Sequence, residues 1–159
     1  MVFISGIHGV GKTYFCNIIK EKIGIPTYSA SDLISKIRNT SFDKNKIVPD
    51  INENQKFLIM AVSKLRASEK PFVLDGHFCL LNKLNEIQRI PYKLFLDLKP
   101  ETIVLLTEKP EIIVERRKKR DNLNISIESI DCFQEAEATY AEEVADRIGA
   151  DLFQMDMKT

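Results

Sequence analysis

Eight residues near the start of the chain constrain its fold more than any other feature. Residues 6–13 read Gly-Ile-His-Gly-Val-Gly-Lys-Thr and match the pattern G-x-x-x-x-G-K-[ST]. Glycines at these spacings let the backbone curl so that several N–H groups point inward and surround an anion. A short apolar run at 2–5 precedes the pattern, and an amphipathic helical pattern from about 11 to 23 follows it. The motif therefore predicts a strand, a phosphate-binding turn and a helix.

The residue types in this turn predict a site for ATP and Mg²⁺. The N-terminus of the helix adds partial positive charge, and Lys12 is expected to reach the β- and γ-phosphates. The Thr13 hydroxyl is expected to bind Mg²⁺. His8 is not part of the pattern and is interpreted as a residue that lines the loop. The predicted ATP-binding residues are Gly6, His8, Gly9, Val10, Gly11, Lys12, Thr13, Tyr14 and Arg117.

Short apolar runs alternate with helical patterns along the rest of the chain. Further strands are expected at 27–28, 71–75, 102–107 and 152–155, and helices at 31–38, 50–65, 110–121 and 126–148. Residues 90–98 are ambiguous and favour a helix, while residues 39–49 are polar and irregular. This alternation predicts a parallel sheet with helices on both faces, whose ligands bind at the carboxyl ends of the strands.

Three local features refine these helices. Ser31 is expected to cap the second helix, and Asp50 with Glu53 forms a capping-box pattern at the start of the third. The first helix is expected to turn four apolar residues toward the core, namely Phe15, Ile18, Ile19 and Ile23.

An aspartate ends the apolar run at 71–75. In nucleotide-binding sheets, an acid at such a strand end fixes the metal, so Asp75 is predicted to lie beside Mg²⁺; a helix cap or turn residue is the alternative. His77 follows two residues later. It is interpreted either as a residue that faces the phosphoryl acceptor or as a hydrogen-bonded structural histidine.

Five consecutive basic residues lie at 116–120, at the end of a predicted helix. Such a run is usually a solvated face, and its cations also favour the negative C-terminus of the helix. The functional alternative is a lid whose arginines stabilise charge on a transferred phosphoryl group and exclude water. Arg116 and Arg120 share one helix face and form the best pair, and Arg117 is assigned toward the adenine.

Composition bounds the remaining possibilities. The chain has 159 residues with 23 basic and 23 acidic side chains, which predicts one domain (1–159) and makes nucleic-acid binding unlikely. No apolar run approaches the roughly 20 residues that span a bilayer, and the first residues lack a basic leader, so a cytoplasmic location without a membrane partner is expected. Cys16, Cys79 and Cys132 show no metal-ligand spacing and are expected to be small apolar residues. The oligomeric state is left open.

Taken together, these segments resemble the P-loop nucleoside monophosphate kinases, and most closely the archaeal-type adenylate kinases. The resemblance rests on the loop at 6–13, on Ser29–Ile34, on Leu74–His77, on 98–113 and on the basic run. It implies an α/β, three-layer P-loop NTPase fold: a five-stranded parallel sheet with helices on both faces and a short lid.

The resemblance also implies roles for residues. ATP with Mg²⁺ would be the donor and AMP the usual acceptor, with acceptor-binding helices at 31–68 and the lid at 116–125. One departure concerns the acceptor, because Ser35 stands where the family usually has an arginine. The implied catalytic residues are Lys12, Arg116, Arg120 and Asp75; the acceptor-binding residues are Ser31, Asp32, Lys36, Arg38 and His77; the metal ligands are Thr13 and Asp75.

Three functional hypotheses follow. The leading one is a nucleoside monophosphate kinase of the adenylate kinase type, acting on a small-molecule nucleotide. The second is a P-loop kinase of another small molecule, which the missing acceptor arginine favours. The third is an ATP-binding switch or slow ATPase that regulates a partner.

Overall fold

The strands form one parallel sheet of five. The computed structural model describes residues 1–40 and 51–157. The sheet has the order β2-β3-β1-β6-β7, and each neighbouring pair is parallel. Its strands are β1 (Val2–Ser5), β2 (Thr27–Ser29), β3 (Val73–Gly76), β6 (Thr102–Thr107) and β7 (Asp151–Asp156). The predicted parallel sheet is therefore confirmed.

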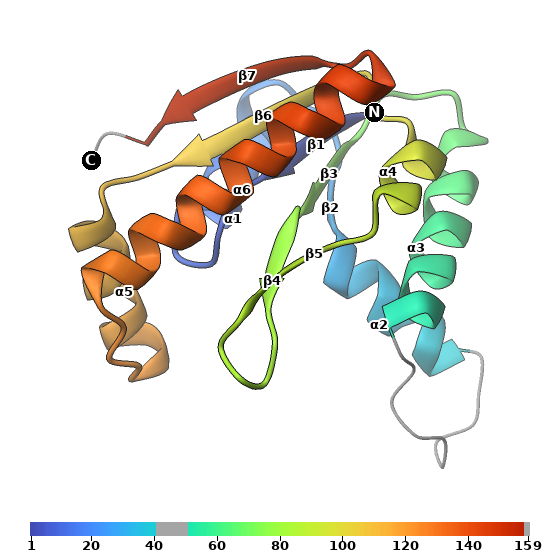
Figure 1. The fold of residues 1–159 in the computed structure, drawn as a ribbon. Helices are drawn as coiled ribbons and strands as arrows, with labels where there is room; N and C mark the ends of the chain where they lie inside the picture. Colours follow the sequence, from blue (N-terminus) through green and yellow to red (C-terminus); the bar gives the residue numbers. More distant parts are fainter. Residues whose placement is uncertain (41–50, 158–159) are drawn as a thin grey trace.

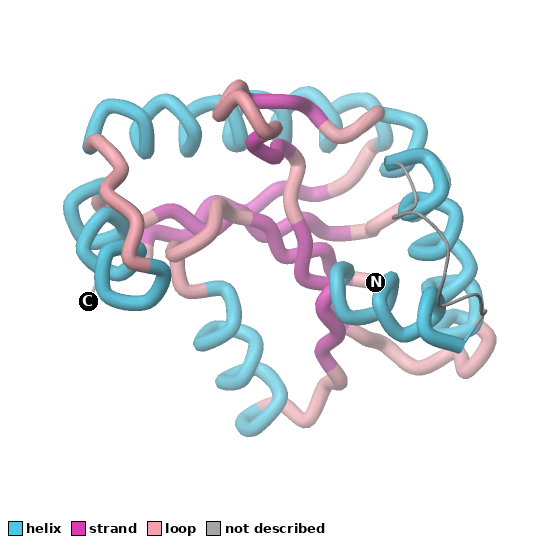
Figure 2. Tube along the Cα trace, turned by 90° about the horizontal axis from the view of Figure 1, so that it is seen from below, coloured by secondary structure: helices cyan, strands magenta, loops and turns pink. Residues whose placement is uncertain are grey.

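Helices lie on both faces of this sheet, as Figure 2 shows. Helix α1 packs against β2 and β3, whereas α6 packs against β6 and β7, with α4 beside it. Figure 1 shows α6 crossing in front of the strands and α1 behind them. The helices are α1 (Lys12–Lys22), α2 (Ala30–Thr40), α3 (Ile51–Arg66), α4 (Tyr92–Leu98), α5 (Pro110–Asp121) and α6 (Ile127–Ile148).

The middle of the sheet is covered on both faces, which explains the continuous apolar runs of its strands. Phe3 and Ile4 of β1 are 2% and 0% exposed. The ring of Phe3 meets the rings of Phe78 and Phe95 edge to face, with centroids 5.3 and 5.8 Å apart. This aromatic cluster fixes the segment after β3 against the central strand β1 of the sheet.

A hairpin that the sequence did not reveal follows β3. Its antiparallel strands are β4 (Cys79–Leu81) and β5 (Ile87–Arg89). The turn is stabilised by Asn82, whose Oδ1 accepts hydrogen bonds from the backbone N–H groups of Leu84 and Glu86. Strands of three residues give too short an alternation to be recognised from sequence. Figure 1 shows the hairpin extending between α5 on one side and α2 on the other.

Two local predictions are wrong, and one lies outside the described residues. The Oγ of Ser29, not of Ser31, accepts a hydrogen bond from the backbone N–H of Asp32, because α2 already starts at Ala30. Ile23 follows the last residue of α1 and is 66% exposed, since the helix ends before its apolar face reaches that position. The expected cap at Asp50 and most of the irregular segment at 39–49 fall within 41–50, outside the described residues.

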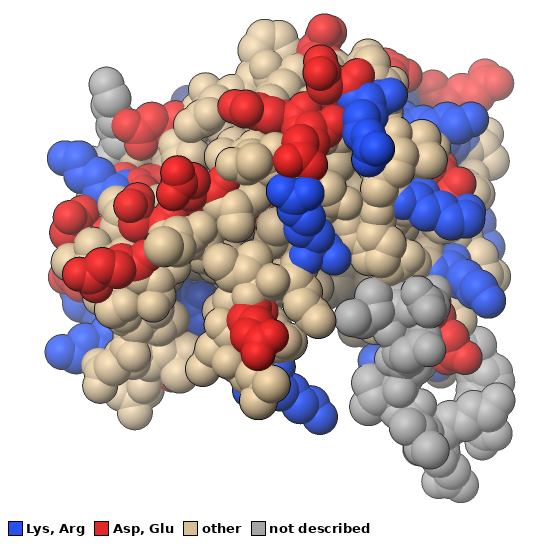
Figure 3. All heavy atoms as spheres, in the orientation of Figure 1, with Lys and Arg blue, Asp and Glu red and all other residues tan. Residues whose placement is uncertain are grey.

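The surface carries mixed charge. Acidic side chains follow the outer face of α6 in Figure 3, where Glu128, Asp131, Glu135, Glu142 and Asp146 are exposed. Across the described ranges, no helix combines the length and apolar character that crossing a membrane requires.

Candidate functional site

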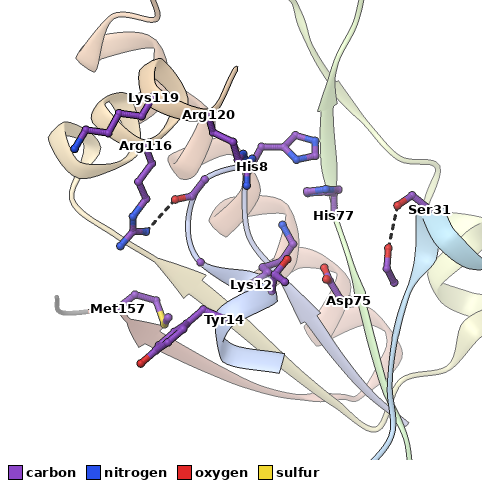
Figure 4. A pocket seen from close by; sticks show the side chains of 14 residues that line it. His8, Lys12, Tyr14, Ser31, Asp75, His77, Arg116, Lys119, Arg120 and Met157 are labelled. Atoms are coloured by element: carbon purple, nitrogen blue, oxygen red, sulfur yellow. Dashed lines mark hydrogen bonds between the residues drawn. The ribbon is translucent and has the colours of Figure 1, made fainter. Parts of the chain in front are cut away.

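A cavity of about 760 Å³ opens where the phosphate loop, the end of β3 and helix α5 meet. This is the carboxyl-end side of the sheet, where the topology predicts ligands. Figure 4 shows the α5 side chains on one wall and those of β3 and α2 on the other. The lining residues are His8, Gly9, Gly11, Lys12, Thr13, Tyr14, Ser29, Ser31, Asp75, His77, Arg116, Lys119, Arg120 and Met157.

Two glycines of the loop adopt backbone conformations that other residues rarely adopt. Gly9 has φ of 91° and Gly11 has φ of 108°. Gly11 directly precedes α1, and a Cβ on it would also lie 3.2 Å from the Cε of Met157. Glycine is therefore required at both positions for the loop to curl around an anion at the helix N-terminus.

Lys12 is folded back onto this loop. Its ammonium group donates a hydrogen bond of 2.7 Å to the carbonyl oxygen of Gly6, and the residue is only 8% exposed. Burial lowers the pKa of Lys12, while the nearby Asp75 carboxylate opposes that shift. A buried ammonium with one carbonyl partner retains two free N–H donors. Phosphate oxygens in the cavity would satisfy them.

Thr13 and Asp75 provide oxygen donors to the same cavity. Burial raises the pKa of Asp75, and Lys12 opposes this shift. Mg²⁺ is typically held by one or two protein oxygens together with substrate phosphates, so these two side chains fit it. In the part of the chain that the structure describes, no three His, Cys, Asp or Glu residues gather as a separate metal site.

His77 lies at the centre of the site with a defined tautomer. Its Nδ1 lies 2.8 Å from the carbonyl oxygen of Gly6, which can only accept, so Nδ1 carries the hydrogen. Burial, together with the positive charge of Lys12, lowers the pKa of His77 to about 3. The ring of His8 lies beside it, with centroids 4.4 Å apart. Neutral His77 therefore carries an unprotonated Nε2, which can accept a hydrogen bond.

Arg116 is bonded to the outside of the phosphate loop. Its Nη1 donates to the carbonyl oxygens of Gly9 and Val10 at 3.0 and 3.2 Å, and its Nη2 lies 3.4 Å from Glu108 Oε2. The Glu108 side chain is 1% exposed. The side-chain amide of Gln134 in α6 pairs with the backbone of Glu108: its Oε1 accepts from the Glu108 N–H group, and its Nε2 donates to the Glu108 carbonyl oxygen. A chain of contacts thus connects α6 to the loop through Arg116.

The other basic residues of α5 are placed differently from one another. Arg120 and Lys119 line the cavity, and Arg120 is 65% exposed with its Nε 3.4 Å from Asp121. Arg117 does not line it: its stem lies along Gly9, and its Nε lies 2.7 Å from Asp121. The assignment of Arg117 to ATP binding, like the lid at 116–125, stays a prediction.

A second cavity of about 280 Å³ adjoins the first. It lies between α2, α3, α4 and the β3–β4 segment, and it is largely apolar. The two cavities share five lining residues, namely His8, Ser29, Ser31, Asp75 and His77. The other residues of the second cavity are Phe3, Ala30, Ile34, Asn54, Gln55, Leu58, Gly76, Leu80, Ile90 and Leu94.

The structure brings together most of the predicted site residues. Gly6 and Val10 are buried within the loop and contribute through its shape, whereas the other predicted loop residues line the first cavity. Of the predicted acceptor-binding residues, Ser31 and His77 line both cavities. Asp32, Lys36 and Arg38 line neither cavity, and their roles remain predictions.

Glu137 is a supporting residue that sequence reasoning missed. Its carboxylate is 1% exposed and accepts hydrogen bonds from Ser5 Oγ and from the backbone N–H groups of Phe78 and Cys79, at 2.7–3.1 Å. It thereby fixes the end of β1 relative to the segment that follows β3. A charged residue within the apolar stripe of α6 was the available signal. No comparable sequence pattern marked four other residues as part of the site, namely Glu108, Met157, Asn54 and Gln55.

Comparison with known protein families identifies the family of this chain. Residues 5–133 match the family described as an AAA domain. The chain belongs to that family. Its matched region runs from the end of β1 into α6 and contains all of the phosphate loop.

Curated relatives of this AAA domain include adenylate kinases. The chain is 28% identical to a putative adenylate kinase of Methanocaldococcus jannaschii over 75% of its own length and 58% of that protein. It is 26% identical to an adenylate kinase of Pyrobaculum aerophilum, over 88% of this chain and 76% of that protein. A chloroplastic adenylate kinase of Zea mays is 28% identical over 72% of this chain and 53% of its own length. The predicted resemblance to archaeal adenylate kinases is thus confirmed.

Solved structures confirm the fold. A gluconokinase from Sinorhizobium meliloti 1021 superposes with a TM-score of 0.52 at 19% identity, covering 99% of this chain and 82% of that one. A sugar kinase from Janibacter sp. HTCC2649 superposes with a TM-score of 0.56 at 16% identity, covering 99% and 85%. The three-layer P-loop NTPase fold predicted for this AAA domain is therefore confirmed.

Proposed function

We propose that this protein is an ATP-dependent phosphotransferase that passes the γ-phosphate of ATP to a nucleoside monophosphate. The observation that carries the proposal is the junction of the two cavities. One cavity has the phosphate loop and the α5 cations, the other is bounded by α2 and α3, and Asp75 and His77 lie where they meet. A donor in the first cavity and an acceptor in the second would therefore place their reacting groups side by side.

The transfer needs no covalent intermediate on the protein. A phosphate oxygen of the acceptor bonds to the γ-phosphorus, the bond from that phosphorus to the β–γ bridging oxygen breaks, and ADP leaves with the electron pair. Lys12 and Arg120 offset the negative charge on the transferred group, while the buried floor of the site excludes water. Mg²⁺, when bound by Thr13 and Asp75, would neutralise charge on the β- and γ-phosphate oxygens.

The names of the relatives support this proposal, since three of them are adenylate kinases. A kinase of another small molecule is the second candidate. It is favoured by the second cavity, where the described lining includes no lysine or arginine to hold an acceptor phosphate. In the nucleotide proposal, that phosphate lies at the junction, within reach of the cations of the first cavity.

A panel of acceptors tests both candidates. The protein is incubated with Mg·ATP and, separately, AMP, CMP, GMP, UMP or gluconate, and ADP and the phosphorylated acceptor are quantified. Lys12→Ala gives the background rate. A nucleoside diphosphate that the wild type, but not Lys12→Ala, forms from the added monophosphate, with ADP production that depends on that monophosphate, supports the proposal, whereas turnover of gluconate alone supports the second candidate. ADP production that no acceptor changes would instead indicate a slow ATPase or switch.

A further inference from the structure

We infer that Asn54 and Gln55 of α3 select the acceptor by hydrogen bonding to the edge of an uncharged nucleobase. The inference rests on the proposed function, because it takes the acceptor to be a nucleotide. It assigns the part of the second cavity remote from the phosphate loop to the base and names the residues that distinguish one base from another.

Both side chains carry a polar atom without a partner. Asn54 Oδ1 and Gln55 Nε2 are shielded from solvent and have no hydrogen-bond partner among the described residues. Both residues line the second cavity. Buried polar groups are nearly always paired in a folded protein, so an unpaired acceptor and an unpaired donor next to an open cavity indicate a missing ligand.

The rest of the lining favours an uncharged group beside the two amides. Seven apolar side chains line the same cavity: Phe3, Ala30, Ile34, Leu58, Leu80, Ile90 and Leu94. The titratable lining residues His8, Asp75 and His77 are all among those shared with the ATP cavity. The charged end of an acceptor is therefore favoured at the junction, and its neutral end beside the amides.

A nucleobase fits both requirements. Its faces are apolar enough to pack against aliphatic side chains, and its edge presents hydrogen-bond donors and acceptors side by side. The Asn54 oxygen would accept from the base, and the Gln55 N–H group would donate to it. A sugar or sugar acid would instead direct hydroxyl groups at Leu58, Ile90 and Leu94, which offer no partner.

The test uses two shape-preserving substitutions in the full chain, Asn54→Leu and Gln55→Met. Lys56→Gln is the matched control, because Lys56 lies on the same helix, is exposed and lines neither cavity. The measurements are kcat and KM for AMP, CMP, GMP and UMP, with the Kd of Mg·ATP from calorimetry. Each substitution should raise the KM of the preferred nucleotide about 10-fold and reduce the preference among the four bases. The Kd of ATP should change less than about 2-fold, as in the control.

Unchanged acceptor KM and unchanged base preference in both variants would overturn the inference while leaving the proposed function intact. A wild type that phosphorylates none of the four nucleotides would instead refute the proposed function, and the inference with it. Should an apolar variant fail to fold, Gln55→Glu keeps the shape and exchanges the donating amide N–H group for a carboxylate oxygen, which can only accept. It is expected to change the order of base preference, and an unchanged order would count against the inference.

Discussion

The guanidinium group of Arg116 donates a hydrogen bond to the carbonyl oxygen of Gly9, 3.0 Å away. A residue of α5 therefore holds the phosphate loop from outside, although 107 positions separate it from Gly9. When the N–H groups of such a loop turn toward an anion, its carbonyl groups turn outward and need donors. Arg116 supplies them, and Glu108 fixes the guanidinium in place.

We therefore expect Arg116→Ala to weaken ATP binding. Loss of the charge-assisted hydrogen bonds to Gly9 and Val10 removes roughly 1.5–3 kcal/mol, which corresponds to a Kd for Mg·ATP raised about 10- to 100-fold. Calorimetric titration measures this, with Lys118→Ala as control because Lys118 is exposed and lines neither cavity. An unchanged Kd with a collapsed kcat would mean that Arg116 acts on the transferred group instead.

Arg120→Ala tests the other arginine of the predicted lid. Arg120 lines the cavity and pairs only with exposed Asp121 among the described residues, so it is available to a ligand. Removing a cation that stabilises the transferred group should lower kcat about 100-fold or more. The Kd of Mg·ATP should change less than about 3-fold, because the loop and Lys12 remain. Steady-state kinetics that match those of Lys118→Ala would remove Arg120 from the mechanism.

Substitution of Glu137 should destabilise the whole fold. Glu137→Leu leaves Ser5 Oγ and the N–H groups of Phe78 and Cys79 without their buried acceptor. At about 1–3 kcal/mol for each unpaired group, the free energy of unfolding should fall by roughly 3–5 kcal/mol after partial relaxation. Urea unfolding measures this difference, and Glu135→Leu at an exposed site of the same helix is the control. A loss below about 1 kcal/mol would contradict the role assigned to Glu137.

His77 should make the protein less stable in mild acid. Its pKa falls from 6.5 to about 3 on folding, so below pH 6.5 the unfolded chain binds the proton that the native state excludes. The contribution of neutral His77 to the free energy of unfolding is therefore fully present above pH 6.5 and is lost progressively toward pH 3. At about pH 5 the loss from this group is about 2 kcal/mol, from 1.5 pH units at 1.36 kcal/mol each.

His77→Asn is the comparison for this effect, since its amide retains a donor toward the Gly6 carbonyl but does not titrate. Urea unfolding measures how far the free energy of unfolding falls between about pH 7.5 and pH 5. This fall should be about 2 kcal/mol smaller in the variant than in the wild type. Because the lowered pKa of His8 acts in the same direction in both proteins, some decline should persist. Identical pH dependence in the two proteins would show that folding does not lower the pKa of His77.

Local patterns in the sequence identified most of the secondary structure. All five strands of the parallel sheet and the helix at Tyr92–Leu98 were predicted, because each depends on a run of neighbouring side chains. The β4–β5 hairpin was not, since its short strands are set by the turn at Asn82. Ser29 replaced Ser31 as the cap of α2 because β2 leads directly into that helix.

Residues close together in the chain are sufficient to specify the phosphate loop, the alternating strands and helices and the Asp75 strand end. Only the packing of the folded chain brings Arg116 to Gly9, connects Glu137 to β1 and to the segment after β3, and places Asn54 and Gln55 in the lining of the largely apolar second cavity. These contacts depend on how helices from different parts of the chain pack on the sheet. A pattern of neighbouring residues does not encode that packing directly, since each helix can satisfy its apolar face in several ways.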